Sequence, residues 1–74
     1  MQMQPVESKL LRAVGYDPGI RTLQVQFTSG AVYQYFDVPP ETYEGLRQAE
    51  SHGRYFLANI RDAYPYSRVG RRRR

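Results

Sequence analysis

Cysteine and tryptophan are absent from this chain of 74 residues, and histidine occurs once. Without cysteine the chain has neither a disulfide framework nor a thiolate metal site. The single histidine, His52, has no partner at metal-ligand spacing, so we expect a surface-loop residue and no metal role. No cofactor is expected from this composition.

Long apolar runs are also missing. No run approaches the ~20 residues of a membrane span, and no apolar segment of the kind found in signal peptides follows the N-terminus. We expect a cytoplasmic protein with no membrane partner. Neither a nucleophile beside a base nor a glycine-rich phosphate loop is recognisable, and the scattered carboxylates have no second catalytic group. An enzyme is therefore not expected.

Positive charge is concentrated at one end of the chain. The formal net charge is +4, but residues 1–67 hold six Lys and Arg against seven Asp and Glu. The excess comes from Arg68 and from the four arginines at 71–74. Such a tail can bind phosphates, meet an acidic protein surface, or remain a solvated segment.

Alternating side chains predict a three-stranded antiparallel meander over residues 8–16, 20–28 and 31–37. Asp17-Pro18-Gly19 is a strong turn signal between the first two strands. After Pro39, the sequence predicts one helix beginning near Pro40 and a second over 53–63, with Ser51 as its cap. The second helix should bury an apolar stripe that consists of Phe56, Leu57, Ile60 and Ala63.

Strands followed by helices indicate an α+β fold, with two short helices packed on one face of the sheet. The expected organisation is a mobile N-terminal arm over residues 1–7, a single domain over 8–69, and a basic C-terminal tail over 70–74. We expect a monomer when the protein is free.

The turn at Ser29-Gly30 decides where Tyr33 and Tyr35 point, because a shift of one residue in pairing exchanges the two faces of a strand. A two-residue loop would place both tyrosines on a polar face, where RNA bases could stack. A three-residue loop with Gly30 in a bulge would pair Val25 with Tyr33, and the tyrosines would join the core.

Several motifs together resemble the KTSC domain, a short module named for its occurrence at the C-terminus of some lysyl-tRNA synthetases. They are Ser8, Val14-Gly15-Tyr16, Leu23-x-Val25-x-Phe27, Ser29-Gly30, Tyr33-x-Tyr35, Val38-Pro39, Ala49-x-Ser51-x-Gly53, Tyr55-Phe56, Ile60-Arg61 and Tyr64-x-Tyr66. One departure is Leu57, where similar sequences often carry asparagine. The resemblance implies a free-standing bacterial or phage binding module, and RNA is its usual suggested ligand.

The resemblance also implies a second function, because a phage-encoded protein similar to this family binds bacterial RNA polymerase and redirects transcription. Our first hypothesis is such a non-enzymatic regulator, bound to a polymerase subunit near the nascent RNA in the host cytoplasm. The alternative is direct binding of tRNA or single-stranded RNA through the tyrosines and the arginine tail. Candidate contact residues are Lys9, Arg12, Tyr33, Tyr35, Arg61, Tyr64, Tyr66, Arg68, Arg71, Arg72, Arg73 and Arg74.

Overall fold

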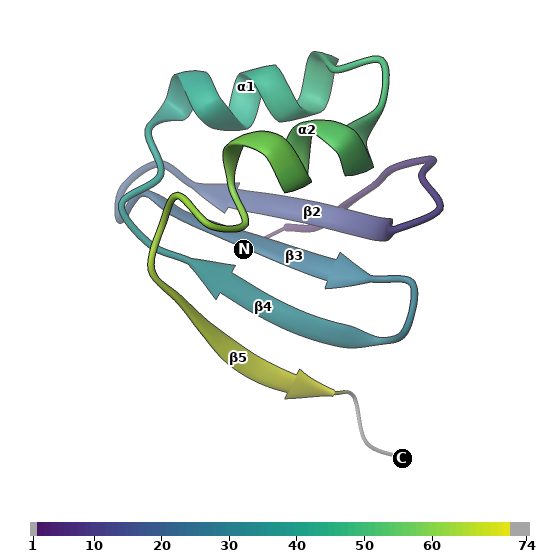
Figure 1. Cartoon of the computed structure of the whole chain (residues 1–74). Coiled ribbons are helices and arrows are strands. Elements are labelled where there is room, and N and C mark those ends of the chain that lie inside the picture. The colour runs from purple at the N-terminus through teal and green to yellow at the C-terminus, as the bar shows by residue number, and fades with distance from the viewer. Residues whose placement is uncertain (1, 72–74) are drawn as a thin grey trace.

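The computed structural model describes the backbone of residues 2–71 and the side chains of residues 2–69. It contains one antiparallel sheet, whose five strands lie side by side in sequence order (Figure 1). Two helices, α1 (Pro40–Gln48) and α2 (His52–Asn59), lie over one face of this sheet. The strands are β1 (Gln4–Pro5), β2 (Leu11–Asp17), β3 (Thr22–Phe27), β4 (Ala31–Tyr35) and β5 (Tyr66–Arg71).

The α+β class is confirmed, but the predicted number of strands was wrong. The expected meander is the centre of the sheet, and an edge strand is added on each side. On one side Gln4 pairs with Val14, so part of the expected arm belongs to the sheet. On the other side β5 pairs with β4 from Tyr66 to Arg71, so the first two residues of the expected tail do too. Neither segment shows strand-like alternation, and both form because a neighbouring strand offers unpaired backbone groups.

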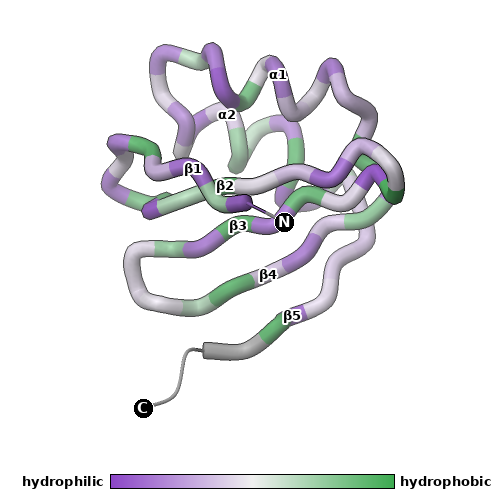
Figure 2. The backbone as a smooth tube through the Cα atoms, turned by 180° about the vertical axis from the view of Figure 1, so that it is seen from behind, coloured by the Kyte–Doolittle hydropathy of each residue, from purple (hydrophilic) through white to green (hydrophobic). Residues whose placement is uncertain are grey.

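The hairpin between β3 and β4 has the three-residue loop. The backbone N–H of Gly30 donates to the Phe27 carbonyl at 2.9 Å, and Gly30 has a φ of 100°. A side chain is strained at that angle, which is why glycine suits this position. Val25 pairs with Tyr33 and Leu23 with Tyr35, so both tyrosines lie on the helix-covered face. Apolar and hydrophilic positions alternate along β3 in Figure 2.

Helix α1 begins where the sequence predicts, and α2 begins one residue earlier than predicted. Pro40 occupies the first turn of α1, and the Ser51 hydroxyl accepts the Arg54 N–H at 3.2 Å to cap α2. However, α2 ends at Asn59, because Ile60 already leaves helical geometry with a φ of −123°. The predicted stripe is thus wrong at two positions: Leu57 is 43% exposed and Ala63 is also exposed.

His52 is the first residue of α2 rather than a loop residue. It is half-buried, and its Nδ1 lies 2.8 Å from the Leu46 carbonyl, which can only accept. The imidazole therefore donates to a carbonyl group near the C-terminal end of α1 and joins the two helices. Among the described residues there is no cluster of three metal-ligating side chains.

Gly45 is a point of close contact between α1 and α2. A Cβ added there would lie 2.7 Å from Tyr55 Cζ and closer still to its hydroxyl. Within a helix, alanine is normally more favourable than glycine by ~1 kcal/mol of stability. We nevertheless expect Gly45→Ala to lower the free energy of unfolding, by about 1–2 kcal/mol, because the Tyr55 ring must move out of its packed position. Urea denaturation measures this change.

The matched control repeats Gly45→Ala in a Tyr55→Leu background. Without the ring, the same substitution should be neutral or stabilising. Stabilisation by Gly45→Ala in the wild-type background would contradict the proposed contact.

Candidate functional site

An open groove lies beside the aromatic end of the sheet, between β4, β5 and the turn that follows α2. Its volume is about 400 Å³, within the range of small-ligand sites. In Figure 1 the helices lie away from β5, which leaves this part of the sheet face uncovered. The groove is lined by Phe27, Ser29, Ala31, Tyr33, Tyr35, Arg61, Asp62 and Tyr66.

The floor of the groove is an aromatic cluster. Tyr35 is only 2% exposed, and its ring packs edge-on against Phe56 with centroids 5.4 Å apart. Tyr66 is 57% exposed, and its ring lies 5.5 Å from that of Tyr33 and 5.5 Å from that of Tyr35. The cluster therefore has a buried part that fixes the rings and an exposed ring that can accept a planar ligand.

The rim of the groove carries two opposite charges. Arg61 and Asp62 lie in the turn after α2, with a guanidinium nitrogen 3.7 Å from a carboxylate oxygen. Their side chains are 57% and 83% exposed, so this pair contributes little to stability. The backbone beneath them is fixed, because the Arg61 N–H donates to the Phe56 carbonyl and the Ala63 N–H to that of Ile60, both at 3.0 Å.

Arg68 adds a second positive charge on the same face of the sheet. It lies directly opposite Tyr33 in the register between β4 and β5, and residues opposite each other share a face. The groove thus brings together five of the residues predicted from the sequence. Four of them line it, namely Tyr33, Tyr35, Arg61 and Tyr66, and Arg68 lies next to it on the same face of the sheet.

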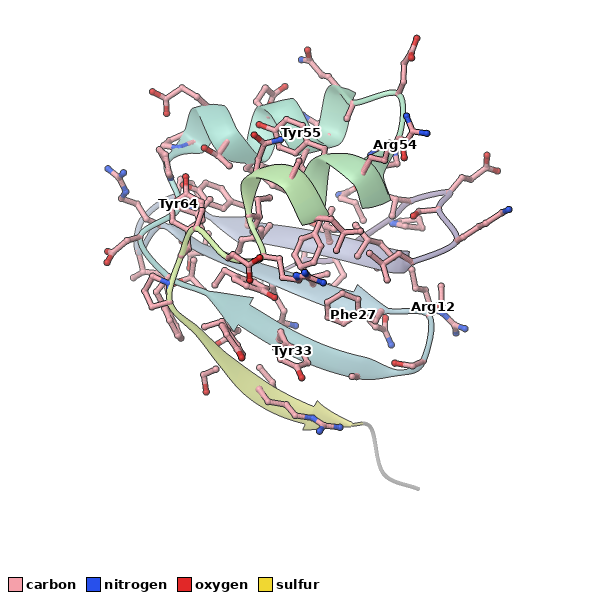
Figure 3. All side chains as sticks on the ribbon, viewed as in Figure 1. Arg12, Phe27, Tyr33, Arg54, Tyr55 and Tyr64 are labelled. Carbon is pink, nitrogen blue, oxygen red and sulfur yellow. The ribbon has the colours of Figure 1, made fainter. Side chains whose placement is uncertain are left out.

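The remaining predicted residues lie elsewhere. Lys9 and Arg12 are exposed beside the start of β2, and neither lines the groove. Tyr64 points away toward α1, where its hydroxyl is 3.2 Å from that of Thr42 (Figure 3). Arg71 is described only as backbone at the end of β5, and residues 72–74 lie outside the described residues.

Two residues that are important in the groove, Phe27 and Asp62, were not predicted as site residues from the sequence. Phe27 packs edge-on against Tyr33 at 5.5 Å, and Figure 3 shows both rings on the side of the sheet facing α2. The register that follows from the three-residue loop would have predicted that Phe27 and Tyr33 lie close together. Asp62 was expected to be helical, and only the early end of α2 brings it to the rim.

The site perturbs the ionisation of Tyr35. Burial raises its pKa from the usual 10 to about 12, the neighbouring Tyr33 and Tyr66 also raise it, and Arg61 lowers it. The folded state therefore holds this proton more tightly than the unfolded chain does. The resulting stabilisation is complete below pH 10 and is lost as the pH rises from 10 to 12.

We expect the urea midpoint of the wild type to fall more steeply between pH 10 and pH 12 than that of Tyr35→Phe. Alkaline titration of tyrosinate absorbance should also lose a component near pH 12 in the variant. Parallel midpoint curves for the two proteins would refute the assignment.

A separate contact explains two of the sequence motifs structurally. The Ser8 hydroxyl accepts the N–H groups of Leu10 and Leu11 at 3.1 and 3.2 Å, which shapes the turn before β2. A Cβ on Gly53 would lie 3.1 Å from the Ser8 hydroxyl oxygen. The serine and the glycine thus let α2 pack closely on this turn.

Comparison with known proteins identifies the family. The KTSC domain model matches residues 7–64, and the chain belongs to the KTSC domain family. The crystal structure of a KTSC domain protein from Yersinia pestis superposes with a TM-score of 0.91 at 36% identity, covering 93% of this chain and 97% of that one. No helix in the described part of the chain has the length and apolarity needed to cross a membrane.

Two relatives show that similar sequences occur both in a small protein and within a longer one. A protein of Tsukamurella paurometabola is 53% identical over 53 residues, which are 72% of this chain and 79% of the relative. A lysine–tRNA ligase of a Nostoc species is 36% identical over 63 residues, which are 85% of this chain but 11% of the ligase. The chain therefore corresponds to a small part of that longer protein.

Proposed function

We propose that this KTSC domain is a non-enzymatic module that binds single-stranded RNA in the groove between β4, β5 and the turn after α2. The observation that carries the proposal is the exposed ring of Tyr66 on an aromatic floor, with Arg61 in the same groove and Arg68 on the same face of the sheet. Stacking of a base on an aromatic side chain contributes ~1–3 kcal/mol, and nearby arginines attract the phosphates.

Two further facts support RNA as the ligand. Arg71 is the last residue of β5 and three more arginines follow it in the sequence, so positive charge is concentrated at this end of the chain. The name of the Nostoc relative, lysine–tRNA ligase, concerns an enzyme that acts on tRNA.

Fluorescence anisotropy with a labelled single-stranded RNA tests the proposal. We expect binding at low salt, an affinity that falls steeply as salt is added, and weaker binding by double-stranded RNA. Deletion of residues 71–74 should reduce the salt dependence. Absence of binding at low salt by a folded protein would refute the proposal.

Binding to RNA polymerase is the second candidate. The observation that favours it is the outer edge of β5, which pairs only with β4 among the described strands. Such an edge can accept an extended segment from a protein partner. A tagged chain should then retain polymerase subunits from a bacterial extract after RNase treatment. Loss of the subunits on RNase treatment would favour contact through RNA, and their absence from untreated eluates would refute polymerase binding.

A further inference from the structure

We infer that the groove selects guanine, with Asp62 and Arg61 reading the edge of a base that stacks on Tyr66. This inference rests on the proposed RNA-binding function and adds the identity of the base. It starts from the unusual rim of the groove, where a carboxylate stands in a site otherwise suited to a polyanion.

A carboxylate beside an RNA site costs affinity unless it has donors to accept from. Asp62 is not needed for the fold, because its side chain is 83% exposed and its contact with Arg61 at 3.7 Å is long for a strong ion pair. Its oxygens are therefore free to accept hydrogen bonds from a ligand. The hydrogen-bonded backbone of the turn keeps the Asp62 carboxylate at the rim of the groove.

The two side chains present a specific pattern to a base. A carboxylate offers two acceptors side by side, and a guanidinium offers only donors. Guanine is the base whose Watson–Crick edge has two adjacent donors, N1–H and the N2 amino group, next to the acceptor O6. Uracil has one donor on this edge, and adenine and cytosine each have one amino group beside an acceptor. The pattern of Asp62 and Arg61 thus complements guanine best.

The groove is large enough for one base but not for a nucleic-acid duplex. Its volume of about 400 Å³ suits a single nucleotide, and its floor provides the exposed face of Tyr66. Single-stranded RNA is commonly read in this way, by stacking an unpaired base and hydrogen-bonding its Watson–Crick edge.

The test uses short uridine oligonucleotides that carry one central guanosine, adenosine or cytidine, with the all-uridine strand as reference. We expect the guanosine probe to bind about tenfold more tightly than the others, because a bidentate pair discriminates by roughly that factor. Asp62→Asn should bring all four probes within about twofold of one another and should raise the affinity for the all-uridine strand, because it removes a negative charge beside the RNA. Glu41→Gln, which removes a negative charge on α1 away from the groove, should keep the preference.

The outcomes separate the two proposals. Equal binding of all four probes by the wild type would overturn guanine selection and leave RNA binding standing. Preference for guanosine that survives Asp62→Asn would also overturn the assignment to this pair. No binding of any probe at low salt would remove the proposed function and this inference together.

Discussion

Replacement of Phe56 by alanine is expected to leave most of the protein unfolded at room temperature. Phe56 is fully buried, and its ring meets those of Phe27 at 5.5 Å and Tyr35 at 5.4 Å. Truncation of such a residue costs ~3–5 kcal/mol, through lost burial and a cavity. A domain below ~80 residues rarely has more than about 3–5 kcal/mol of stability in total.

Circular dichroism during a thermal ramp measures this result, and Leu57→Ala is the matched control. Leu57 is the next residue of the same helix but is largely exposed, so its truncation should cost less than about 1 kcal/mol. A cooperative transition for Phe56→Ala within a few degrees of the wild type would contradict the proposed role of this ring.

Replacement of Tyr66 by alanine is expected to weaken binding of single-stranded RNA by about tenfold. Tyr66 has the most exposed ring of the cluster, so it is the ring on which a base can stack, whereas Tyr35 is buried beneath it. Loss of one stacked base costs ~1–3 kcal/mol. A tenfold loss of affinity corresponds to about 1.4 kcal/mol, which lies in the lower half of that range. Anisotropy titrations at fixed salt give the ratio.

Two controls make this prediction sharp. Tyr66→Phe keeps the ring and should retain affinity within about twofold. Val69→Ala changes an exposed residue of the same strand that does not line the groove, and should also have little effect. An unchanged affinity for Tyr66→Ala, with the fold shown to be intact, would contradict the stacking role.

The central elements of the fold could be predicted from local sequence, but its edges could not. Alternation along β3 and β4 and the cap at Ser51 are local signals, and both were confirmed. Strand β1 (Gln4–Pro5) has too few residues to show a period. The arginines and the glycine of β5 interrupt the alternation that would indicate a strand. These strands exist because of pairing with β2 and β4, which is tertiary information.

The candidate site was only partly predictable for the same reason. The register of one hairpin moves Tyr33 and Tyr35 from a solvent platform to the floor of a groove, and two common loop lengths differ by that one step. Tyr66 and Arg68 join them only because β5 returns to the sheet. The position of Asp62 depends on the helix ending at Asn59, and helix ends are poorly specified by composition.

Mapping of amide chemical shifts tests most directly whether the groove binds single-stranded RNA. On titration of isotope-labelled protein with a short single-stranded RNA, we predict the largest shifts at residues 29–35, 60–63 and 66–68, which surround the groove. Shifts concentrated on the opposite face of the sheet, at Gln24, Gln26 and Gln34, would contradict the account. So would the absence of any shift with the RNA in excess at low salt.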